Sequence, residues 1–257
     1  MTLDPNTTMQ HMHFSRIQRR QHGVALFVVI VFVMLSMLLT LWASRTSLFN
    51  EMVISNDADY QRAFEAAQAL QQDAELDIRG ENSDGTTCIK DAGNPKICRG
   101  ATSIAQIPLE AQEVGLLLAD LNTTTEKCRN GLCIKRTAKQ DFWNNTDQSL
   151  GITLAQMTGV GARYGEYTGA QLGSTSNPAN PILSETDADK GGWYWIEVLP
   201  YDESSKNSGL IVGSPTNLLP LNLLPNVVYR ITSLAYGRKP NTMVVLQQTY
   251  VRQKLKD

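Results

Sequence analysis

Near its N-terminus the chain carries one long run of apolar residues. Residues 24–43 have the sequence VALFVVIVFVMLSMLLTLWA, without a charged side chain, and Ser36 and Thr40 bear their only hydroxyl groups. In a helix that rises about 1.5 Å per residue, such a run spans about 30 Å, the thickness of the hydrocarbon core of a bilayer. The pattern therefore predicts a transmembrane helix.

The helical pattern continues beyond the apolar run. Residues 44–79 contain neither proline nor glycine, and good helix formers are frequent from Ala58 onward. Gly80 then suits the C-terminal end of a helix. Apolar residues recur at spacings of three and four, which predicts one stripe that packs against a folded head. The stripe consists of Tyr60, Phe64, Ala67, Leu70, Ala74 and Ile78.

Three later segments have the composition of β-strands. β-Branched and aromatic residues dominate residues 192–199, 226–236 and 242–252, and residues 237–241 suit a hairpin connection between the last two. Alternation along residues 227–232 predicts a sheet with one face against the long helix and the other outward. The expected fold class is α+β, with a long N-terminal helix, membrane-spanning in its first half, packed on an antiparallel β-sheet head.

The rest of the head carries weaker signals. Apolar residues between Ala101 and Leu121 indicate a short helix. Residues 165–192 and 200–226 are rich in Gly, Ser, Asn, Asp and Pro, which indicates long loops.

Charges are distributed unevenly along the chain. Arg16, Arg19 and Arg20, against the single acid Asp4, give residues 1–23 a net charge of +2, whereas residues 24–257 carry −4. Basic residues that precede an apolar helix hold that side of the membrane protein in the cytoplasm. We therefore expect the bulk of the chain to be exported, and its weakly acidic head gives no indication of a nucleic-acid surface.

Four cysteines, Cys88, Cys98, Cys128 and Cys133, follow the predicted transmembrane helix. An even number of cysteines in an exported domain indicates disulfides, for which three pairings are possible. We favour Cys88–Cys98 with Cys128–Cys133, because each pair closes a short loop that contains turn residues. The alternative is a zinc site with four thiolates, although the spacings of nine and four intervening residues fit zinc ribbons poorly.

Side chains suited to catalysis are scarce. The chain has three histidines: His11, His13 and His22. The head therefore has no imidazole to activate a nucleophilic serine or cysteine. Neighbouring carboxylates, such as Asp57 and Asp59, lie in sequences that look solvated, so nothing indicates a perturbed acid. Residues 187–192 imitate the start of a calcium loop but lack its later ligands. We expect no catalytic residue, no metal site and no cofactor.

The boundary before the apolar run carries a more specific signal. Residues 19–26, RRQHGVAL, resemble the cleavage site of type IV prepilins and type II secretion pseudopilins. Residues 62–70, RAFEAAQAL, are similar to a motif in the long helix of PilX-type minor pilins. Residues 229–252, with YRITSLAYG followed by VVLQQTYVR, are similar to the C-terminal hairpin of the same family.

The resemblance implies a pilin-like fold and a place in a type IV pilus. A membrane peptidase would cut between Gly23 and Val24, so the apolar helix would serve first as a membrane anchor and later as the filament core. Most major pilins carry Glu at the fifth mature position, where this chain has Val28. The absence of this Glu fits a subunit at or near the filament tip. The residues expected to pack in the filament are Val24, Leu26, Phe27, Val28, Val31 and Leu35.

Four parts of the chain follow from the resemblance. They are a prepilin leader (1–23), a transmembrane and filament-core helix (24–43), the periplasmic half of the long helix (44–80) and a periplasmic α+β head (81–257). The expected partners are other minor pilins, the major pilin, the prepilin peptidase, the inner-membrane assembly proteins and an adhesin at the tip. The expected location is the bacterial inner membrane, with the N-terminus cytoplasmic and the head periplasmic, and then the pilus.

Other interpretations remain open. A type II secretion minor pseudopilin would share these features. A single-pass membrane protein with a periplasmic ligand-binding domain would keep its leader attached. A secretory signal peptide fits less well, because its apolar region is shorter and small residues precede its cleavage site, whereas Leu41 and Trp42 precede Ala43 here.

Overall fold

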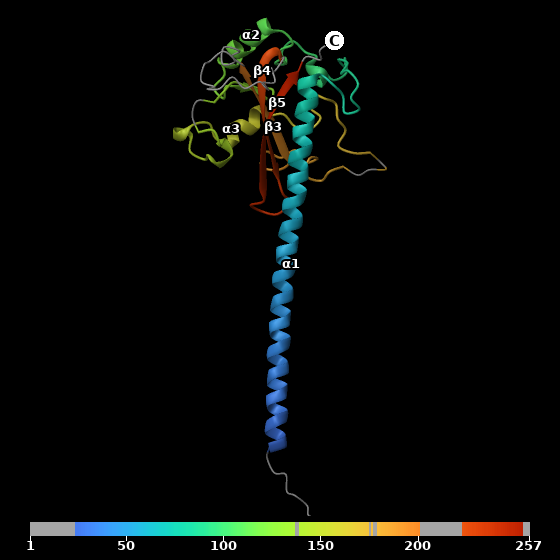
Figure 1. Cartoon of the computed structure of the whole chain (residues 1–257), viewed down its shortest axis with the longest axis vertical. Coiled ribbons are helices and arrows are strands. Elements are labelled where there is room, and N and C mark those ends of the chain that lie inside the picture. Colours follow the sequence, from blue (N-terminus) through green and yellow to red (C-terminus); the bar gives the residue numbers. More distant parts are fainter. Residues whose placement is uncertain (1–23, 137–138, 175, 177–178, 201–222, 254–257) are drawn as a thin grey trace, which may run out of the picture. The chain divides into compact units, whose positions relative to one another are not determined.

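The computed structural model describes residues 24–136, 139–174, 176, 179–200 and 223–253. Met1–Val53 and Ile54–Asp257 form two units, which we describe one at a time. Helix α1 (Val24–Arg79) contributes to both units (Figure 1). The expected cleavage residue Gly23 and the leader charges Arg16, Arg19 and Arg20 lie outside the described residues.

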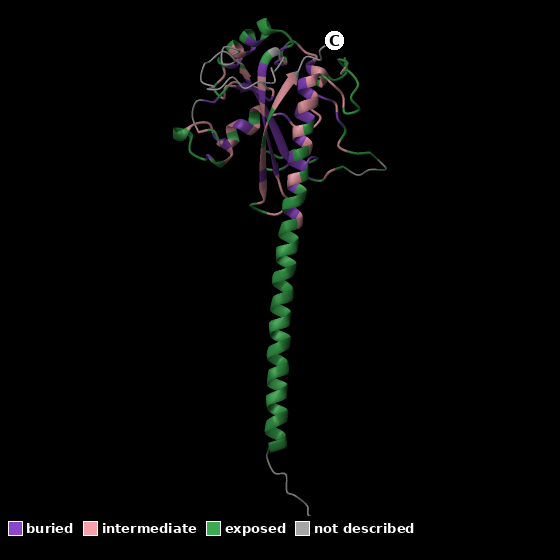
Figure 2. Ribbon diagram, in the orientation of Figure 1, coloured by how far each residue is buried: buried purple, intermediate pink, exposed green. Residues whose placement is uncertain are grey.

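The described part of the first unit is the beginning of α1. Every residue from Val24 to Val53 is helical and exposed (Figure 2). By length and composition, α1 is the one described helix suited to crossing a membrane. The prediction of a single helix over residues 24–79 is confirmed.

A five-stranded sheet forms the centre of the second unit. Its strands are β1 (Cys128–Arg129), β2 (Leu132–Cys133), β3 (Gly192–Pro200), β4 (Leu223–Tyr236) and β5 (Met243–Gln253), in that spatial order. Figure 1 labels the three long strands β3, β4 and β5. The pairs β3–β4 and β4–β5 are antiparallel, as predicted. The sheet is thus mostly antiparallel, and the α+β fold class is confirmed, although β2 pairs with β3 in the parallel sense. A long connection separates these two strands in the sequence, which permits a parallel pairing.

Short helices surround the sheet. The predicted short helix is α2 (Ala111–Leu121), and a second one, α3 (Leu154–Val160), was not predicted. At the start of α3, the Thr153 backbone N–H donates to Gln156 Oε1 at 3.0 Å and the Gln156 N–H donates to Thr153 Oγ1 at 3.4 Å. This capping box is a sequence signal for a helix start. Three short 3₁₀ segments complete the described set: Ile97–Arg99, Phe142–Asn144 and Gln148–Leu150.

Both faces of the sheet are covered. Tyr194, Ile196 and Val198 of β3 pack on one face with residues of α1 and α2. Trp193 and Trp195 pack on the other face, in a second cluster that also contains Phe142 of a 3₁₀ segment, Met157 of α3 and the Cys128–Cys133 pair. The expectation that this second face points outward is therefore wrong. Since β3 is apolar at both odd and even positions, each of its faces needs a cover.

The buried face of α1 differs from the predicted stripe. Ala67, Leu70, Ala74 and Ile78 are buried as predicted, but Tyr60 is 48% exposed and Phe64 is only partly buried. The face that meets the head includes Ala63 and Ala66, whose small side chains permit a close approach to the sheet. It also includes three acids, Asp59, Asp73 and Asp77.

Candidate assembly surface

The first part of α1 presents an apolar surface without a cover in the described chain. The six residues expected to pack in a filament are between 36% and 72% exposed. Large apolar side chains lie on all sides of this segment, including Phe32, Leu38 and Trp42. A helix that is apolar all round is stable only when a membrane or other protein surfaces surround it.

The few polar groups of this segment bond within the helix. Ser36 Oγ donates to the Val33 carbonyl at 2.8 Å, and Thr40 Oγ1 donates to the Met37 carbonyl at 2.9 Å. The first helical turn contains no acid, and Val28 occupies the fifth position after Gly23. Both hydroxyl groups from Val24 to Ala43 are therefore satisfied within the helix, which suits a hydrocarbon environment, and the indole N–H of Trp42 lies near the end of the segment, where an interfacial tryptophan can reach a polar partner.

In the second unit, Asp59 fixes the hairpin between β4 and β5. The backbone N–H groups of Arg238 and Lys239 donate to its two oxygens at 2.9 and 3.0 Å. Burial raises the pKa of Asp59, but these N–H groups and the charge of Lys239 outweigh that effect and lower the pKa on balance. Lys239 Nζ also contacts Ser55 Oγ and Asn56 Oδ1 at 2.5 and 2.8 Å. The expectation that Asp59 is solvated is wrong, since it is 2% exposed.

A second acid of α1, Asp73, holds the loop that precedes residue 170. It accepts hydrogen bonds from the Gly165 backbone N–H at 2.7 Å and from the Thr168 hydroxyl. Burial raises the pKa of Asp73 to about 6, although these two donors act in the opposite direction. The carboxyl is 1% exposed and both its oxygens are engaged, so a substrate has no access to it.

The third acid, Asp77, forms a buried ion pair. Arg99 donates to its two oxygens through Nε at 2.8 Å and Nη2 at 2.6 Å, and the Tyr194 hydroxyl donates to Oδ2 at 3.1 Å. Arg99 also lies over the ring of Tyr167, with 4.1 Å from Cζ to the ring centroid. Burial lowers the pKa of Arg99, but the Asp77 charge outweighs it and raises that pKa.

Sequence reasoning missed these acids, although a signal for them exists. Asp59, Ala63, Ala66, Leu70, Asp73 and Asp77 are separated by three or four residues throughout. An acid in register with an apolar stripe lies on the buried face of the helix, where it needs a donor from the packed head.

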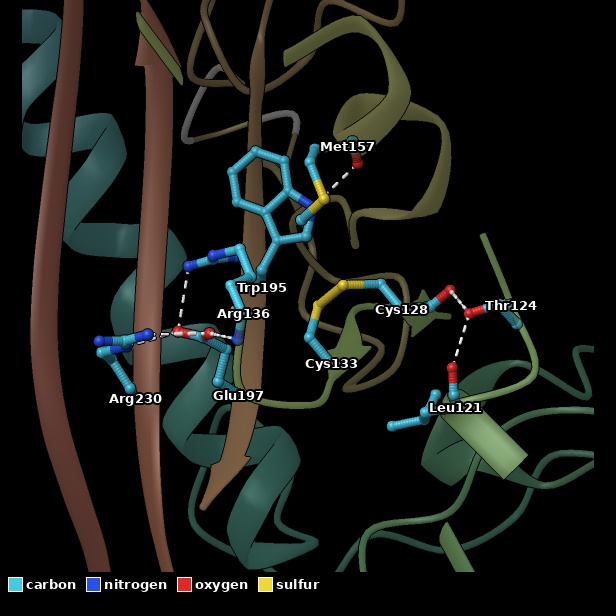
Figure 3. Close-up of a disulfide and its surroundings, with 9 residues drawn as sticks. All are labelled: Leu121, Thr124, Cys128, Cys133, Arg136, Met157, Trp195, Glu197 and Arg230. Atoms are coloured by element: carbon cyan, nitrogen blue, oxygen red, sulfur yellow. Dashed lines mark hydrogen bonds and ion pairs between the residues drawn. A yellow bond between two sulfur atoms is a disulfide. The ribbon is translucent and has the colours of Figure 1, made fainter. Parts of the chain in front are cut away.

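A fourth buried acid lies on the opposite face of the sheet. Glu197 of β3 is fully buried and accepts from Arg136 Nη2 at 3.0 Å and from Arg230 Nε at 2.5 Å (Figure 3). Figure 3 also shows the neighbouring Trp195, whose Nε1 donates to the Met157 carbonyl at 2.9 Å. The ion pairs of Glu197 with Arg136 and Arg230 thus join β3 and β4 to the segment after β2.

All four cysteines form disulfides, with Cys88 bonded to Cys98 and Cys128 to Cys133. This is the short-loop pairing that the sequence favours, and it leaves no thiolate for a zinc site. Cys128–Cys133 closes the β1–β2 hairpin, whose turn residues Asn130 and Gly131 both have positive φ. The described residues contain no cluster of His, Cys, Asp and Glu that could hold a metal ion.

The segment that imitates a calcium loop is occupied by an arginine. Arg163 donates to four backbone carbonyls around it, those of Glu185, Thr186, Asp187 and Lys190, at 2.9–3.1 Å. The same guanidinium lies 3.9 Å from the centroid of the Trp193 ring. Arg163 thus supplies the positive charge at the centre of this loop, in the place where a calcium loop holds its metal ion.

Comparison with known protein families gives two matches. The family model described as "Type IV pilus assembly protein PilX C-term" matches residues 118–252. The model for the PilX N-terminal region matches residues 22–69. The first model alone matches more than half of the chain. No curated protein and no solved structure matches.

Proposed function

Since this chain belongs to the PilX family of type IV pilus minor pilins, we propose that it enters the pilus at or near the tip and takes part in priming assembly. Its role is structural, and its partners are other minor pilins and the major pilin. It is made as a prepilin, cleaved between Gly23 and Val24, and held in the inner membrane with the head in the periplasm.

The observation that carries this proposal is the exposed apolar part of α1. It begins directly after Gly23, contains no charge up to Ala43 and bonds its own hydroxyl groups. Such a segment is stable in lipid and equally stable among the apolar helices of neighbouring subunits. The same helix can therefore leave the membrane only where other helices receive it.

The position of Val28 supports a place near the tip. A carboxylate in an apolar environment is costly unless a positive group pairs with it. Most major pilins carry Glu at the position of Val28. Without that Glu, this chain has no carboxylate there to pair with the N-terminal amine of a neighbouring subunit. Such a subunit fits one end of the filament better than its repeating shaft.

Mass spectrometry of the membrane-extracted chain tests the processing step. For the wild-type protein we expect a mature chain that begins at Val24. The Gly23→Val variant should insert in the membrane but stay uncleaved, and cells that carry it should have fewer pili. The control Gly115→Val changes an exposed glycine of α2, where an added Cβ meets no atom within 4 Å, and should be cleaved and assembled normally. Normal piliation by uncleaved Gly23→Val would contradict the proposal.

A further inference from the structure

The two edges of the sheet differ greatly in length. At one edge β1 has two residues and is bonded to β2 by the Cys128–Cys133 disulfide. At the other edge β5 has eleven residues, Met243–Gln253, and pairs with β4 alone. Among the described residues, no hydrogen bond joins a backbone group of β5 to any segment except β4.

The hydrogen bonds at the hairpin show which backbone groups of β5 face away from β4. The Gly237 N–H donates to the Thr242 carbonyl at 2.8 Å, and bonded and non-bonded pairs alternate along an antiparallel ladder. The register continues without a shift from Tyr236–Met243 to Val228–Val251. The backbone N–H and C=O groups that point outward therefore belong to alternate residues: Met243, Val245, Gln247, Thr249 and Val251.

This edge lacks the features that usually prevent pairing with another chain. Natural edge strands are protected by prolines, bulges, charges or very short length. Residues 243–253 contain no proline or glycine, and their one charged side chain is Arg252. The one irregularity of the ladder lies beyond Val228. A long edge of this kind accepts an additional strand with little rearrangement.

We propose that the outer edge of β5 is the surface on which another pilin subunit of the assembly docks, by adding an extended segment to the sheet. Gln248 of β5 donates to Glu75 of α1 at 2.8 Å, so the edge strand lies beside the part of α1 that attaches the head. The incoming segment pairs its backbone with the five outward residues. Its side chains are apolar opposite Val245 and Leu246, and acidic near Arg252. The inference rests on the proposed function, because it requires that this chain meets other pilins.

Amide hydrogen exchange measured residue by residue provides the direct test. The samples are the full-length chain in detergent, alone and co-purified with its minor pilins. In the isolated chain, Val245, Gln247 and Thr249 should exchange quickly, whereas Val244, Leu246 and Gln248 should exchange slowly. In the complex, only the first three should change, each slowing by at least about tenfold, since a sheet hydrogen bond protects its amide.

A substitution supplies an independent test. Thr249→Pro removes an outward N–H without removing a bond to β4. We expect it to reduce the recovery of minor pilins about tenfold, whereas the matched control Thr249→Val, which keeps the N–H, should recover them normally. Equal thermal unfolding temperatures for the two variants would show that folding is intact.

Several results would overturn the inference. One is a complex that forms while Val245, Gln247 and Thr249 still exchange quickly. Another is protection of these amides in the isolated chain, which would assign the edge to a second copy of this chain. Failure of the wild-type chain to recover any pilin would refute the proposed function together with this inference, whereas pilin recovery without protection would refute the inference alone.

Discussion

The buried ion pair between Asp77 and Arg99 allows a sharp prediction about the attachment of the head to α1. The side chains of Arg99 and Asp77 are 4% and 3% exposed. Arg99 also donates through Nη1 to the Ala105 carbonyl at 2.8 Å. Asp77→Ala leaves the guanidinium buried without a counter-charge and removes the acceptor of the Tyr194 hydroxyl.

The expected cost is large. Removal of one partner of a buried ion pair costs about 3–5 kcal/mol, because the remaining charge is uncompensated. The matched control is Asp120→Ala, which breaks the ion pair with Arg129, where the two side chains are 42% and 41% exposed. An exposed pair contributes at most about 1 kcal/mol. Hence the two variants should differ by several kcal/mol in the free energy of unfolding.

Urea unfolding of the full-length chain in non-ionic detergent measures this difference. Trp193 and Trp195, which are 2% and 0% exposed, should change their fluorescence when the head unfolds. The double variant Asp77→Leu/Arg99→Met should recover most of the lost stability, since apolar residues can replace a buried ion pair. A cost for Asp77→Ala as small as that for Asp120→Ala would refute the reasoning.

Two further predictions concern the other contacts of α1. The pKa of Asp73 is raised to about 6 from an ordinary 3.8, so the folded head holds this proton more tightly than the unfolded chain. The stability that the protonated Asp73 provides is thus fully present below pH 3.8 and is lost as the pH rises through 6, by up to about 3 kcal/mol. In unfolding experiments between pH 4 and 7, Asp73→Asn should remove this decline. A Cβ atom added at Gly237 would collide with the Asp59 carboxylate and lie 2.6 Å from Thr242 Cβ. Gly237→Ala should therefore cost about 1–3 kcal/mol of thermal stability, whereas Gly115→Ala, which meets no atom within 4 Å, should cost nothing.

The elements that sequence reasoning predicted are those with a strong local pattern. Helix α1 has a long apolar run, then a three- and four-residue period without Gly or Pro, and its predicted end at Arg79 agrees with the structure. Strands β3 and β5 have many β-branched and aromatic residues, and their predicted bounds differ from the structure by one residue at most. The predicted start of β4 was three residues late, because Pro225 lies before the irregularity at Val228 and masks the beginning of the strand.

The elements that were missed depend on distant contacts. Strands β1 and β2 have two residues each, which is too short for any period, and they exist because of a tight turn, a disulfide and pairing with β3. The second core was missed although β3 is apolar at both odd and even positions. Of the three acids on the buried face of α1, Asp59 was assigned to solvent, and Asp73 and Asp77 were overlooked. Their three- and four-residue spacing indicates the face on which they lie but not the donors that meet them there, which come from residues about 20 to 180 positions away in the sequence.

The three buried acids of α1 suggest why the head is attached by polar contacts as well as apolar ones. An interface of Ala and Leu alone could shift by one helical turn at small cost, because such side chains are nearly interchangeable. Asp59 and Asp77 are 18 residues apart, about 27 Å along the helix, and each bonds to a different segment of the head. A shift of one turn would leave every one of these carboxylates without its donors.

We therefore infer that these acids fix the register between α1 and the head. A subunit that is anchored through one helix needs a fixed register if its docking surface is to face its partners. The double variant Asp77→Leu/Arg99→Met isolates this role, because it should keep the stability and lose part of the specificity. Its tryptophan indole N–H resonances should double or broaden in NMR spectra, whereas Asp120→Ala should leave one sharp set. A single sharp set in the double variant would show that apolar packing alone determines the register.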